Sequence, residues 1–93
     1  MSAPQEESAE ELAGQLSVLA SGLRELGLRV KVVPGRFPPR LTVTNPQVAQ
    51  LSEVIYAAIG RDNDPCFWWS WQEPIDAIAN TEAAAARIAR VLA

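Results

Sequence analysis

Residues 67–71 read Phe67-Trp68-Trp69-Ser70-Trp71 and contain all three tryptophans of the 93-residue chain. Four of its six aromatic side chains lie in these five positions. Successive side chains of a β-strand alternate between the two faces of the sheet. The stretch therefore predicts Phe67, Trp69 and Trp71 on one face, and Trp68 between Cys66 and Ser70 on the other.

A leucine stripe upstream predicts an amphipathic helix. Ser8 and Glu11 have the spacing of a capping box, so we expect the helix to begin at Ser8 and residues 1–7 to form a flexible acidic tail. Gly27 is expected to end the helix in a left-handed conformation, with Leu28 in a Schellman contact with Leu23. The stripe consists of Leu12, Leu16, Leu19, Leu23 and Leu26.

Alternating apolar and polar residues predict strands at 28–32 and 40–44, separated by the proline-rich loop 34–39. Residues 47–59 fit two patterns. Their apolar spacing allows a helix capped at Asn45-Pro46, but Val54-Ile55-Tyr56 is typical of a strand. We favour a turn at 46–51 and a strand at 52–59 that pairs with a strand at 66–71.

Pro74 is expected to end that last strand, and a closing helix is expected to begin at Asn80 or Thr81. The predicted fold is α+β, in the order α-β-β-β-β-α. It is a four-stranded antiparallel meander with the N- and C-terminal helices on one face. Residues 8–93 form a single domain in this prediction.

Two helices on one face leave the other face of the sheet open. The economical arrangement buries Phe67, Trp69 and Trp71 under the helices and places Trp68 on the open face. The reverse arrangement exposes three large rings, a patch that would itself require a partner or ligand. Either arrangement leaves at least one tryptophan at the surface.

The composition argues against an enzyme. The chain has no histidine and one cysteine, Cys66, which excludes histidine-activated nucleophiles and most zinc sites. Glu53, Glu73 and Asp76 are the carboxylates considered for acid–base chemistry, and a strand-end charge or a turn explains them more simply. We expect no catalytic residues, no metal site and no cofactor.

The N-terminal residues are acidic and lack the basic and apolar regions of a signal peptide. No apolar run approaches the ~18 residues that span a bilayer. We expect a soluble, cytoplasmic protein.

Several motifs resemble those of short proteins of actinomycete bacteria that have no assigned biochemical activity. They are residues 41–46 (LTVTNP), 51–53 (LSE) and 67–75 (FWWSWQEPI), followed by an alanine-rich closing helix. Many of those proteins have glycine at the position of Gln72. The resemblance covers residues 28–93 and implies a strand at 52–59 and a bacterial, cytoplasmic setting. It implies no catalytic residue.

We therefore expect a non-catalytic protein-interaction module, an adaptor or chaperone-like accessory protein. It would act as a homodimer or as the small partner of a larger protein. The alternative is a small-ligand or peptide site at the tryptophan strand, although so small a domain is expected to have little room for a pocket of ~300 Å³. Nucleic acid is an unlikely partner, because such domains are usually basic and the formal net charge here is −3. The predicted partner-binding residues are Trp68, Ser70, Val33, Arg29 and Lys31.

Overall fold

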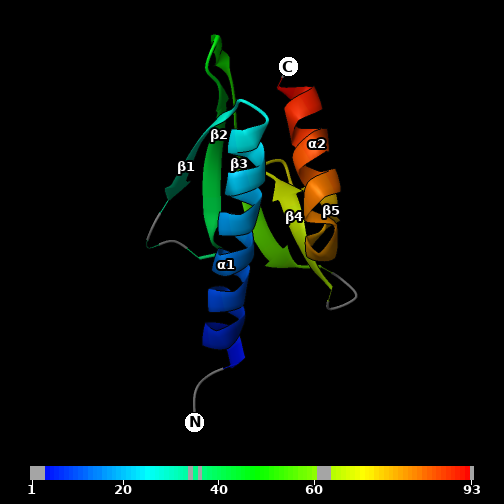
Figure 1. The fold of residues 1–93 in the computed structure, drawn as a ribbon. Coiled ribbons are helices and arrows are strands. Elements are labelled where there is room, and N and C mark those ends of the chain that lie inside the picture. The colour runs from blue at the N-terminus through cyan, green and yellow to red at the C-terminus, as the bar shows by residue number, and fades with distance from the viewer. Residues whose placement is uncertain (1–3, 34, 36, 61–63, 93) are drawn as a thin grey trace.

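The computed structural model describes residues 4–33, 35, 37–60 and 64–92. Five antiparallel strands lie side by side in chain order, and both helices cover one face of this sheet (Figure 1). The α+β class is confirmed, but the sheet has five strands where the sequence predicted four. The elements are α1 (Pro4–Glu25), β1 (Arg29–Val33), β2 (Arg40–Asn45), β3 (Val48–Ile59), β4 (Pro65–Trp69), β5 (Pro74–Ala77), the 3₁₀ turn η1 (Ile78–Asn80) and α2 (Thr81–Val91).

Helix α1 begins earlier than its capping box suggested. It starts at Pro4, so Ser8 lies inside the helix and residues 4–7 are not a flexible tail. Proline is favourable in the first turn, where its missing N–H has no helical partner. Residues 1–3 of the predicted tail lie outside the described residues.

The C-terminal end of α1 forms the predicted Schellman motif. Gly27 has φ of 88°, the amide of Leu28 donates to the carbonyl of Leu23, and the amide of Gly27 donates to that of Arg24. Leu26 lies in this cap and is 54% exposed, so it does not extend the buried stripe. The other four leucines of the stripe are buried.

Strand β3 is longer than expected. It begins at Val48, directly after a two-residue turn at Pro46-Gln47, and not after a turn spanning 46–51. The side chain of Asn45 stabilises the turn by accepting a hydrogen bond from the amide of Gln47. The helical alternative for 47–59 is wrong, and the pairing of this segment with β4 is confirmed.

The fifth strand comes from the residues that follow the tryptophan stretch. Strand β4 ends at Trp69, and a turn brings the carbonyl of Glu73 to the amide of Trp69, 2.9 Å away. Pro74 therefore begins β5 and does not simply end the preceding strand. Proline is tolerated there because it is the first residue of an edge strand.

The core lies between the sheet and the two helices. Phe67 and Trp69 are buried in it, as the economical arrangement predicted. Trp71 is not: it lies in the turn after β4, is 50% exposed and stacks on Trp69 at 4.9 Å between ring centroids. The other fully buried large side chains are Leu16, Leu19, Leu23, Leu41, Val43, Ile55, Ile88 and Leu92.

Candidate interaction surface on the open sheet face

The face of the sheet turned away from α1 and α2, here called the open face, carries a row of side chains from all five strands. Antiparallel pairing places these residues opposite one another in neighbouring strands. Directly opposed side chains on one sheet face lie close enough to interact. Pairing therefore gathers an aliphatic side chain, a cationic one, two aromatic ones and a proline in one line. The row reads Val33, Arg40, Tyr56, Trp68 and Pro74.

Arg40 lies over the ring of Tyr56. Its Cζ is 4.5 Å from the ring centroid, a cation–π geometry. Its Nε donates to the carbonyl of Pro38 at 3.2 Å, and its Nη1 donates to the hydroxyl of Tyr56 at 3.4 Å. These contacts hold the guanidinium of Arg40 against Tyr56 on the open face.

Trp68 is half-buried on the open face and is held by its indole. Its Nε1 donates to the carbonyl of Ala58 at 3.1 Å. The far edge of the ring comes close to Gly60, where an added Cβ would lie 3.4 Å from Cζ2. The indole is therefore fixed in place with one part still accessible to solvent.

A hollow of about 590 Å³ opens over these residues. Its size lies within the range of ligand and peptide pockets, roughly 300–1,000 Å³. The expectation that this small domain has little room for such a space is therefore wrong. The hollow, referred to below as the open-face hollow, is lined by Pro38, Arg40, Tyr56, Ala58, Trp68, Trp69, Ser70 and Gln72.

The charges on the open face share one sign. Among the described strand residues that face this side, Arg29, Lys31 and Arg40 are cationic and none is a carboxylate. The chain as a whole has a formal net charge of −3. The charge of the strand residues on the open face is therefore opposite in sign to the net charge of the chain.

The structure places the five predicted partner-binding residues on or beside this face. Trp68 and Ser70 line the hollow, and Val33 lies in the row beside Arg40. Arg29 and Lys31 are exposed on edge strand β1, further from the hollow. All five thus lie on the open side, but not as one cluster.

The sequence did not identify Arg40 and Tyr56, which lie between Val33 and Trp68 in the row on the open face. Arg40 was placed only as the first residue of the strand predicted at 40–44, and Tyr56 lay in the segment 47–59, which fitted two patterns. The signal that could have found them was the register of β2 with β3, which pairs Arg40 with Tyr56. That register depends on the length of the turn at 46–47, which was predicted too long.

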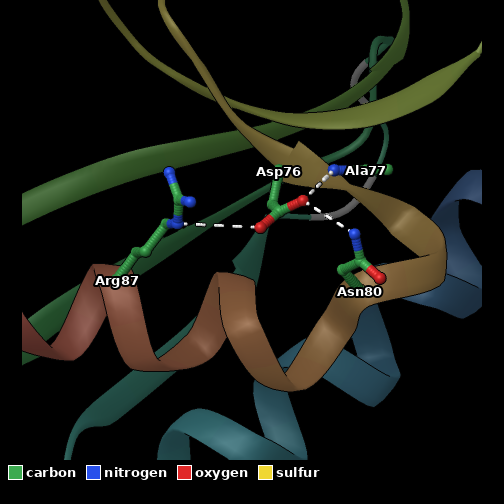
Figure 2. A network of polar contacts seen from close by, with 4 residues as sticks. All are labelled: Asp76, Ala77, Asn80 and Arg87. Atoms are coloured by element: carbon green, nitrogen blue, oxygen red, sulfur yellow. Dashed lines mark hydrogen bonds and ion pairs between the residues drawn. The ribbon is translucent and has the colours of Figure 1, made fainter.

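Asp76, which was considered for acid–base chemistry, is held by three contacts within the fold (Figure 2). Its carboxylate accepts hydrogen bonds from the side chain of Asn80 and the amide of Ala77, and lies 3.6 Å from Nε of Arg87. The hydrogen bond from Asn80, with those other two contacts, lowers the pKa of Asp76. These contacts join the end of β5 to the start of α2.

Cys66 has a local environment that suppresses thiolate chemistry. It is half-buried, and its Sγ lies 3.6 Å from the carbonyl of Asp64. Burial raises the pKa of the thiol, as do the charges of Asp64 and Asp76. In the described part of the chain, no three His, Cys, Asp or Glu residues gather in a way that could hold a metal ion.

Comparisons with protein-family models, with curated proteins and with solved structures give no match for this chain. Across the described ranges, neither helix combines the length and the apolar character needed to cross a bilayer.

Proposed function

We propose that the protein is a non-catalytic interaction module that binds a protein partner through the open face of its sheet. One observation supports this most strongly: Arg40, Tyr56 and Trp68 lie adjacent on a face that neither helix covers. Tryptophan, tyrosine and arginine are the residues that dominate binding energy at protein interfaces. Open faces of antiparallel sheets are otherwise usually polar.

The chemistry of the chain supports a binding role over a catalytic one. It has no histidine, its one thiol has a raised pKa, and the contacts of Asp76 account for that carboxylate. The resemblance to short actinomycete proteins supports a bacterial, cytoplasmic setting. An adaptor or chaperone-like accessory protein is the role that fits these features.

The charge of the face favours a different protein over a second copy. Two identical open faces would bring Arg29, Lys31 and Arg40 against their own equivalents. Like charges brought together across an interface cost binding energy. We therefore favour a heterologous partner over a face-to-face homodimer.

The second candidate function is binding of a small ligand or a free peptide in the open-face hollow. The volume of the hollow, about 590 Å³, is the observation in its favour. The half-accessible indole of Trp68 would supply an apolar wall. A saturable ligand that binds without any protein partner would support this candidate.

Two tryptophans provide a matched test of the proposed function. Trp68→Ala changes the open face, whereas Trp71→Ala removes an exposed ring from the turn beyond it. We expect partner capture from the native bacterium to weaken at least about tenfold for Trp68→Ala and to persist for Trp71→Ala.

A third variant separates binding from folding, because Trp68 is half-buried and its loss also affects stability. Thr42→Glu adds a carboxylate to the open face beside Lys31, the position that pairs with it in β1. It should also weaken capture while leaving the unfolding transition near that of the wild type. Undiminished capture by both Trp68→Ala and Thr42→Glu would contradict the proposal.

A further inference from the structure

The open-face hollow combines a fixed cation with an apolar wall. A guanidinium has five N–H donors, and Arg40 uses one on Pro38 and one on Tyr56, which leaves three. In the described residues the one ion pair joins Asp76 and Arg87, so no carboxylate there pairs with Arg40. Arg40 is thus held in position with donors directed to no described acceptor.

The remaining donors of Arg40 suit one kind of ligand. A planar guanidinium binds a carboxylate through paired N–H groups, and the three N–H groups of Arg40 that remain are on its two terminal nitrogens. Trp68 is the next residue in the row, fixed by its bond to Ala58. A carboxylate at Arg40 would therefore have an apolar surface beside it.

We propose that the open-face hollow binds an acidic segment of the protein partner. Arg40 receives an aspartate or glutamate carboxylate, and Trp68 packs against an adjacent apolar side chain. This inference rests on the proposed function and adds the chemistry of the partner. The charged strand residues of this face are cationic, on a chain whose net charge is negative, and they match such a segment.

The geometry favours an acidic protein segment over nucleic acid. A base would stack on an open aromatic face, and the guanidinium of Arg40 already covers that of Tyr56. Nucleic-acid-binding domains are generally strongly basic, whereas this chain carries −3. Three cations on one face suit a few carboxylates better than a phosphate backbone.

A matched pair of peptides tests the charge requirement. The probe is acetyl-Phe-Asp-Phe-amide, and its control is acetyl-Phe-Asn-Phe-amide, which differs by one charge. Binding is followed by NMR through the terminal guanidinium nitrogens of Arg40 and the indole N–H of Trp68. We expect both signals to shift saturably with the Asp peptide at concentrations up to about 10 mM, and about tenfold weaker binding of the Asn peptide.

Two variants assign the effect to Arg40. Arg40→Gln should abolish the preference for the Asp peptide, with its amide spectrum showing an intact fold. Arg90→Gln removes a cation from α2, on the other side of the molecule, and should keep the preference. This pair separates a specific contact from a change in net charge.

Four results would overturn the inference. Equal binding of the two peptides, or no shift at Arg40 with either, would remove the carboxylate site but leave the capture test of the proposed function intact. Tighter, Arg40-dependent binding of an oligothymidylate would assign the face to nucleic acid. Self-association lost in Arg40→Gln would assign it to a second copy, whose residues 6–11 carry four glutamates.

Discussion

The carboxylate of Asp76 joins strand β5 to η1 and α2. It accepts from Ala77 in β5 and from Asn80 in η1, and it pairs with Arg87 in α2 (Figure 2). The side chain of Asn80 donates to Asp76 and makes no capping hydrogen bond to α2. The position of Asn80 before the helix was predictable from sequence, but its hydrogen-bond partner was not.

A pH dependence of stability follows from these contacts. Because the pKa of Asp76 is lowered in the folded state, its contribution is present above the unfolded value near 4 and is lost as pH falls through the folded value. We expect Asp76→Asn to lose less stability than the wild type between neutral pH and about pH 3. Urea unfolding at both pH values measures this. Asp64→Asn, at an exposed site, is the control, and equal acid loss in Asp76→Asn and wild type would contradict the account.

Two glycines, one inside helix α1 and one at its end, test what stabilises this helix. Gly27 ends it at a φ of 88°, while Gly14 lies inside it, and an added Cβ there would meet no heavy atom within 4 Å other than its chain neighbours and the backbone of its own helix. Gly27→Ala should destabilise the protein by about 1 kcal/mol, because alanine is strained in the left-handed region. Gly14→Ala should stabilise it by about 0.5–1 kcal/mol, because alanine is the better helix former. Urea unfolding should show shifts of opposite sign, and shifts of the same sign would contradict this reading of the helix.

Elements with local signals could be predicted from sequence. The glycine cap of α1, the alternation in β1 and β2, and the start of α2 each depend on a few neighbouring residues. Strand β5 could not be predicted in this way, because four residues beginning with proline become a strand only by pairing with β4. A signal for the preceding turn was present: Gln72 has φ of 68°, at the position where many of the resembling proteins have glycine.

The whole molecule has two unlike faces. The helices and the aromatic residues Phe67 and Trp69 form the core on one side, as the alternation of the tryptophan stretch predicted. The contact of Arg40 with Tyr56 on the other side depends on the register of distant strands, which no local pattern fixes. The sequence therefore predicted Trp68 as part of the candidate surface, but not Arg40 and Tyr56 at its centre.

We propose that the open face of the sheet, and not the face covered by the helices, contacts the partner. A benzophenone amino acid placed at Thr42 on the open face, or at exposed Val18 on α1, tests this directly in cells of the organism that naturally produces the protein. On irradiation, the Thr42 position should crosslink to one discrete protein, and the Val18 position should give little or no adduct. Crosslinks from Val18 with none from Thr42 would contradict the account.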